Sequence, residues 1–260
     1  MNEPQQSPGE EVVAVESNWT GSPGLKARTA GFLYLLVVLG AVFAPFSVVP
    51  SGMMRGDAAL PAIARILASR PSYVLGGAVQ LMVFACDIAV ALILYELLKP
   101  VSRGLALLAA FFRLVFAAVA SANVLNHFAP LLLLDGAGQP GAFTPDQLQA
   151  LALVVIRLRT VGFDIALFFF GLHCIVVGYL LFRSTYFPRN LGLLLAIGGL
   201  GYVANIFANA IPVVIGTKLF PYVMLPGGVA EIWLTLQLIF VGVDVPKWRA
   251  KTSASRVGGE

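Results

Sequence analysis

Long apolar runs dominate the chain, and most polar residues gather in the stretches between them. Six runs stand out: Thr29–Val49, Tyr73–Leu98, Leu105–Ala129, Val161–Phe182, Leu191–Ile211 and Tyr222–Val243. A helix of about 20 apolar residues crosses the roughly 30 Å hydrocarbon core of a membrane. The runs show no alternation of apolar and polar positions, the pattern of barrel strands, so each is predicted to be a helix. The pattern predicts an all-α integral membrane protein with about six transmembrane helices.

The connection over residues 56–70 has a helical pattern of its own. Its apolar residues fall on one stripe, which is typical of a short helix lying in the membrane interface. The residues of this stripe are Leu60, Ile63, Ile66 and Leu67. A loop with incidental helix content is the alternative.

A second connection, over residues 143–159, also has the pattern of a helix. Thr144, Pro145 and Gln147 match a capping box with proline at the first helical position. The stretch from Pro145 to Phe182 is too long for one straight span. We therefore expect an interfacial helix that bends near residues 160–162 into the fourth span, again with an irregular loop as the alternative.

Composition supports a lipid environment and excludes other classes. Hydrophobic residues make up 58% of the chain and charged residues 12%, about half the usual share of charge. The net charge of +4 is modest and lies near the ends of the apolar runs, so no nucleic-acid partner is predicted. Cys86 and Cys174 lie inside apolar runs, which gives no indication of a disulfide framework.

The basic residues predict the orientation in the membrane. With the N-terminus inside, ten of the 17 Lys and Arg residues fall on the cytoplasmic side and six on the outer side, and Arg113 is embedded. This bias predicts that both termini are cytoplasmic. Residues 1–27 and 246–260 are predicted to be disordered cytoplasmic tails that flank a single domain of residues 28–245.

Four ionisable residues on four different spans are predicted to meet near the middle of the membrane. They lie 10 to 13 residues from the nearest cytoplasmic turn, a depth of about 15–20 Å. A charge there costs about 2.5–3.5 kcal/mol on insertion scales, so such groups face the bundle interior and pair with one another. We call this set the polar layer: Asp87, Arg113, His173 and Glu231. It is a candidate ligand-binding site, and a structural charge pair that fixes helix register is the alternative.

The short turn between the second and third spans places Asp87 and Arg113 at nearly equal depth. Because a guanidinium cannot lose its charge at ordinary pH, we expect Arg113 to contact Asp87, with Glu231 as the next anion. Six more polar residues could line an outer cavity above the layer, or could equally form hydrogen bonds between helices. We call them the outer group: Asn123, Asn126, His127, Asp164, Asn205 and Asn209.

Several stretches of the chain resemble one bacterial membrane-protein family. They are "ARTAGFLYLLVVLG", "YELLKPVSRGLALLAAFFRLV", "FTPDQLQALA" and "GYLLFRSTYFPRNLGLLLAIGGLGYVANI". Together they resemble the family defined by domain of unknown function 4386, over about residues 26–212. The resemblance implies a multi-helix protein of the bacterial cytoplasmic (inner) membrane, and it implies no catalytic residue.

The sequence contains no recognisable catalytic or cofactor motif. A zinc-binding His-Glu-x-x-His, a phosphate loop and a Gly-x-Ser-x-Gly elbow are all missing. The glycines of "GGLG" (198–201) are predicted to pack helices closely. His127 and His173 differ in depth by about 20 Å, so a shared haem is not expected, and no metal or cofactor is predicted.

The function expected from the sequence is to bind or move a small molecule or proton through the polar layer, with the lipid bilayer as surroundings. The alternatives are a membrane-embedded enzyme acting on lipid or isoprenoid substrates and a structural subunit of a membrane complex. An enzyme would need a water-reachable nucleophile or acid–base pair, and the sequence shows none.

Overall fold

The protein is a bundle of long helices. The structure is a computed structural model that describes residues 22–47, 59–135, 141, 143–210 and 222–257, and this part contains no strand. The long helices are α2 (Pro23–Ser47), α4 (Arg70–Leu98), α5 (Arg103–Asp135), α6 (Pro145–Arg183) and α7 (Arg189–Ala210). The shorter ones are α3 (Ala59–Ala68), η3 (Tyr222–Met224), α9 (Leu225–Leu236), η4 (Gln237–Val241) and α10 (Val245–Val257).

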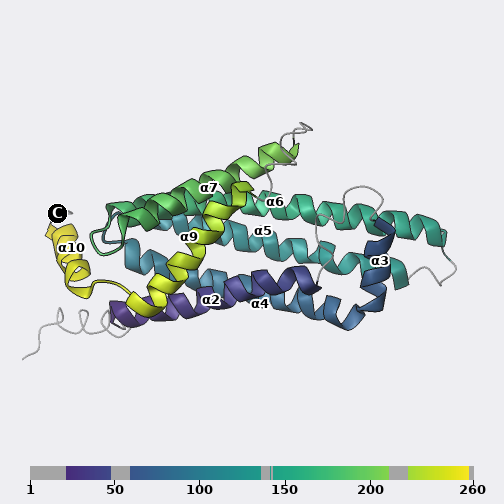
Figure 1. Ribbon diagram of the computed structural model, residues 1–260, viewed down its shortest axis with the longest axis horizontal. Coiled ribbons are helices and arrows are strands. Elements are labelled where there is room, and N and C mark those ends of the chain that lie inside the picture. The colour runs from purple at the N-terminus through teal and green to yellow at the C-terminus, as the bar shows by residue number, and fades with distance from the viewer. Residues whose placement is uncertain (1–21, 48–58, 136–140, 142, 211–221, 258–260) are drawn as a thin grey trace, which may run out of the picture.

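The long helices share one direction, and α9 crosses them obliquely (Figure 1). Helix α6 packs along both α5 and α7, and α2 packs along α4. Helix α9 lies against α7 and α2, so it closes the side of the bundle between them.

The prediction of an all-α membrane protein is confirmed. Within the described ranges, α4, α5, α6 and α7 are long and apolar enough to cross a membrane, and a fifth span is added if the bent pair of Leu225–Val241 and α10 counts as one. The first predicted span corresponds to α2, and the sixth to η3, α9 and η4 together. The predicted number of six spans is not confirmed.

Helix α6 differs from its prediction. It runs without interruption for 39 residues, or about 58 Å, and begins with the predicted capping box at Thr144. The predicted division into an interfacial helix and a span near residues 160–162 is wrong. Gly162 serves close packing instead: a Cβ there would collide with Asn123 of α5, whose Nδ2 donates to the carbonyl of Arg159 at 2.8 Å.

Facing glycines bring α6 and α7 into close contact. A Cβ at Gly178 would lie 2.6 Å from the carbonyl oxygen of Gly192, and one at Gly199 would lie 2.6 Å from that of Gly171. Gly198 meets Gly227 of α9 in the same way. The packing role predicted for "GGLG" therefore holds for its first two glycines, because any side chain there would separate the helices.

At one end of the bundle, α3 packs against α4 and α6 (Figure 1). Ile63 and Ile66 are buried, and Ile66 contacts a small apolar cluster that includes Ile156 of α6. Leu67 is 50% exposed, so it takes no part in this cluster, and the predicted position of the helix in the membrane interface stays a prediction. The side chain of Leu60 lies outside the described residues.

The chain ends also differ from the predicted tails. Helix α2 already begins at Pro23, and residues 1–21 lie outside the described part. Where a disordered tail was predicted from residue 246, the structure has α10, bent by 101° from the preceding helix. Asp244 accepts a hydrogen bond from the backbone N–H of Lys247, and the Trp248 indole donates to the carbonyl of Leu97 at 3.0 Å. The first contact caps the start of α10, and the second holds α10 against the end of α4.

Candidate functional site

Three members of the polar layer meet in the middle of the bundle. Asp87 lies on α4, Arg113 on α5 and His173 on α6. Arg113 has no exposed surface, and Asp87 and His173 are 1% and 2% exposed. The turn between α4 and α5 is only four residues long, so the two helices run antiparallel and bring Asp87 and Arg113 to the same level.

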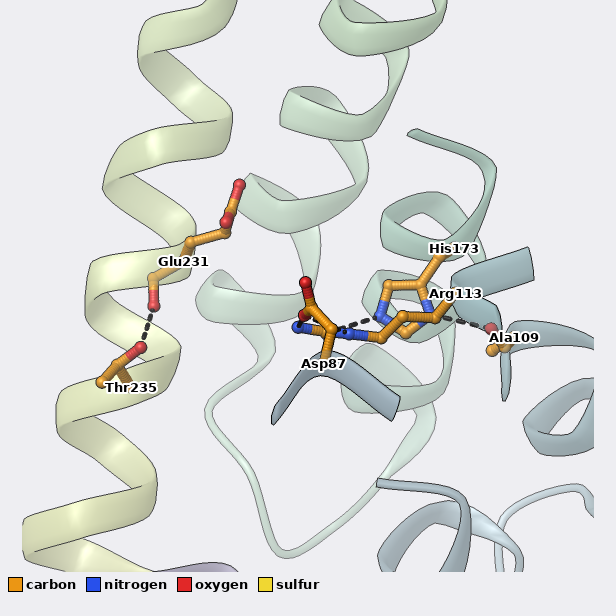
Figure 2. Close-up of polar contacts among 6 residues, drawn as sticks. All are labelled: Asp87, Ala109, Arg113, His173, Glu231 and Thr235. Carbon is orange, nitrogen blue, oxygen red and sulfur yellow. Dashed lines mark hydrogen bonds and ion pairs between the residues drawn. The ribbon is translucent and has the colours of Figure 1, made fainter. Parts of the chain in front are cut away.

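Arg113 bonds both of the other side chains. Its Nε donates to Oδ1 of Asp87 at 2.9 Å, and its Nη2 donates to the same oxygen. Its Nη1 lies 3.1 Å from Nε2 of His173 (Figure 2). The predicted contact between Arg113 and Asp87 is therefore direct.

The hydrogen bonds also determine the state of His173. Its Nδ1 lies 2.8 Å from the carbonyl oxygen of Ala109, and a carbonyl can only accept, so Nδ1 carries the hydrogen. Nε2 then accepts from the guanidinium of Arg113. A doubly protonated ring would turn an N–H toward that guanidinium, so this arrangement requires a neutral His173.

Two aromatic rings complete the surroundings of Arg113. Its Cζ lies 4.6 Å from the ring centre of Tyr34 on α2 and 5.4 Å from that of Phe170 on α6. Both rings offer the negative face of their π system to the cation. The sequence analysis missed Tyr34, although a lone tyrosine within an apolar span was an available signal.

Glu231 is close to this cluster but is not bonded to it. It projects from α9, and Figure 2 shows no bond between its carboxyl group and the other three members of the layer. The hydroxyl group of Tyr202 on α7 donates to it instead. Glu231 was predicted to pair with Arg113 only if Asp87 did not. Because Asp87 pairs with Arg113, this second choice does not apply.

The layer thus holds one guanidinium and two carboxyl groups. Asp87 balances the charge of Arg113, while Glu231 has no ion pair among the described residues. A carboxyl group that accepts a hydrogen bond from one phenol hydroxyl group, that of Tyr202, can take up a proton or bind a cationic group. This is the chemistry that the layer offers.

The outer group is divided among three helix interfaces. Asn126 donates to Asn123 of the same helix, α5, at 2.9 Å, and Asn123 donates across the interface to a backbone carbonyl of α6. Asn205 of α7 donates to Asp164 of α6 at 3.1 Å. His127 stacks on Tyr73 of α4 and donates from Nε2 to its carbonyl oxygen at 2.7 Å. The side chain of Asn209 lies outside the described residues.

Two further polar residues of this region, Arg159 and Gln80, were missed by the sequence analysis. Arg159 was counted among the basic residues of the outer side, at the end of the predicted interfacial helix, whereas on α6 it faces α4, and its Nη2 donates to Oε1 of Gln80 at 2.9 Å. A single arginine near the end of an apolar run gives no sign of which way it will face.

The two cysteines, Cys86 and Cys174, are free thiols. Over the residues that the structure describes, no three His, Cys, Asp or Glu side chains form a group able to hold a metal ion. The expectation of no metal or cofactor stays a prediction.

Comparisons with known proteins support the resemblance seen in the sequence. One relative is a protein of the archaeon Archaeoglobus fulgidus, described as an uncharacterized protein, with 30% identity over 127 residues. The match covers 48% of this chain and 60% of that protein, so the chain spans less than two thirds of its length. No solved structure matches the chain significantly. The model of the family called domain of unknown function 4386 (DUF4386) matches residues 29–242, and the chain therefore belongs to that family.

Proposed function

We propose that this protein binds a small molecule or a proton at the polar layer and moves it across the cytoplasmic membrane of a bacterium. In this proposal both termini face the cytoplasm, as the distribution of Lys and Arg favours. The observation that carries the proposal is that the layer holds two carboxyl groups but only one guanidinium. Glu231 is a second carboxyl group beside an ion pair that is already balanced, and the hydroxyl group of Tyr202 donates to it.

A purely structural layer would have no need of this second carboxyl group. The Asp87–Arg113 pair with His173 already links α4, α5 and α6. An unpaired carboxylate among apolar helices is costly, and that cost is removed when Glu231 gains a proton or a cationic ligand. Tyr202 lies on α7 and Glu231 on α9, so a change at the carboxyl group would act on the contact between these two helices.

The test replaces Glu231 by Gln and compares it with Glu96→Gln, the same chemical change outside the polar layer. Glu96 lies at the end of α4, between Lys26 and Lys99. Each purified variant is measured in two ways: dissipation of a pH gradient in proteoliposomes, followed with a pH-sensitive dye, and native mass spectrometry for small molecules that co-purify.

We expect the parent and Glu96→Gln to dissipate the gradient or to retain a co-purifying molecule, and Glu231→Gln to lose that property. If all three proteins behave alike in both measurements, the proposal is wrong. Circular dichroism of each variant establishes that Glu231→Gln is folded before the comparison is made.

A further inference from the structure

We propose that the protein has a second site, separate from the polar layer, that binds a phosphate group at Arg159. It lies between α4, α5 and α6, toward the end of the bundle that carries α3. It shares no residue with the polar layer and does not depend on the function proposed above.

The geometry of Arg159 is that of an inward-facing side chain. It is half-buried, whereas Arg157 and Leu158 just before it are exposed. Its Nη2 donates to Oε1 of Gln80 across the interface with α4. Gln80 is itself oriented by a bond from its Nε2 to the carbonyl of Gly76 at 3.2 Å.

A side chain of helix α5 holds the backbone of α6 at Arg159. The carbonyl of Arg159 accepts from Asn123, and Asn126 in turn donates to Asn123. Arg159 is therefore held by amide side chains of two helices: Gln80 bonds its guanidinium and Asn123 bonds its carbonyl oxygen.

The charge of Arg159 is not balanced by these neighbours. Arg70 pairs with Asp135 and Arg113 pairs with Asp87, but Arg159 makes no ion pair with any residue that the structure describes. Its bonded partner, Gln80, is neutral. A guanidinium has five N–H donors and keeps its charge at all ordinary pH values, so several donors remain for an anion.

The depth of Arg159 identifies the anion as a phosphate group. Arg159 is 24 residues from Arg183 at the other end of α6, about 36 Å along the helix. The hydrocarbon core is about 30 Å thick, so Arg159 lies at the level of the lipid head groups. The planar fork of arginine matches the oxygens of a phosphate. Phosphate chemistry at this level can come from an anionic phospholipid or from a soluble phosphate compound that enters from the aqueous side.

The experiment measures thermal unfolding of the full-length protein in a detergent without phosphate, at constant ionic strength set with chloride. One arm adds dioleoyl phosphatidylglycerol and the other adds inorganic phosphate. The variants are Arg159→Gln and, as the matched control two residues away on the exposed side of α6, Arg157→Gln.

We expect one of the two additions to raise the unfolding temperature of the parent and of Arg157→Gln at low concentration. Arg159→Gln should need a concentration of that lipid or phosphate at least about tenfold higher for the same rise, because charge-assisted hydrogen bonds are lost. A response to the lipid identifies a head group, and a response to inorganic phosphate identifies a soluble phosphate.

Equal responses of the two variants, or no response of the parent to either addition, would overturn the proposal. If Arg159→Gln does not fold, Arg159→Lys takes its place, since it keeps the charge but loses the planar fork. Weaker binding by the Lys variant then supports the site, and unchanged binding refutes it.

Discussion

Replacing Asp87 by Asn removes the counter-charge of Arg113 while keeping the size and shape of the side chain. Asp87 accepts two hydrogen bonds from the guanidinium, and neither side chain reaches the surface. The variant therefore leaves a buried cation with only His173 and the rings of Tyr34 and Phe170 beside it. It should lower the stability of the protein substantially.

The size of the loss follows from these contacts. A hydrogen bond to a charged group contributes about 1.5–3 kcal/mol, and stranding one partner of a buried pair costs about 3–5 kcal/mol. Because Asn keeps one acceptor oxygen, we expect Asp87→Asn to lower the free energy of unfolding by about 3 kcal/mol, the lower end of this range. For a domain of this size that is a fall of about 6–12 °C in unfolding temperature.

Circular dichroism during heating in detergent measures this change. Asp135→Asn is the matched control: Asp135 pairs with Arg70 at an exposed position, where an ion pair contributes about 0–1 kcal/mol. Asp87→Leu combined with Arg113→Met should recover much of the loss, though not all, because Nε2 of His173 then lacks its donor. If Asp87→Asn is as stable as Asp135→Asn, the Asp87–Arg113 pair does not contribute the expected free energy of unfolding.

Two other predictions concern topology and packing. Reporter fusions after Arg103 and Arg189 should score as cytoplasmic and fusions within residues 136–142 as periplasmic; the reverse pattern would contradict the proposed orientation. Gly192→Ala should destabilise the bundle by about 1–3 kcal/mol through overpacking, because its Cβ would meet the backbone of α6. Gly104→Ala has open space around it and should leave the unfolding temperature unchanged or raise it, so equal losses would refute the packing argument.

The contact between Arg113 and Asp87 could be predicted because membrane physics leaves few alternatives. Lipid cannot solvate a guanidinium, and a short turn between two spans fixes their relative depth. The same reasoning named Glu231 only as the second choice of anion for Arg113 and gave no partner for it in the case that Asp87 pairs with Arg113. Depth along a helix does not specify which way a side chain points around it, so the bond from Tyr202 of another helix to Glu231 could not be predicted.

The errors on α6 and α10 have a common origin. Thr160–Gly162 was interpreted as a bend because α6 exceeds the thickness of a membrane, whereas Gly162 allows Asn123 of α5 to approach. The last residues were interpreted as a tail because they are polar, whereas Trp248 fastens α10 to the end of α4. In both places one contact with a distant helix outweighs the local pattern.

The sequence alone determined that this is an all-α membrane protein with a charged layer at its centre, because apolar length and the cost of buried charge are properties of the chain and its solvent. The tertiary structure alone decided that the ring of Tyr34 faces Arg113 and that Arg159 faces inward, without an ion pair to any residue that the structure describes. Both depend on how each helix is rotated about its own axis. That rotation is set by the packing of all the helices together, which no single run of residues encodes.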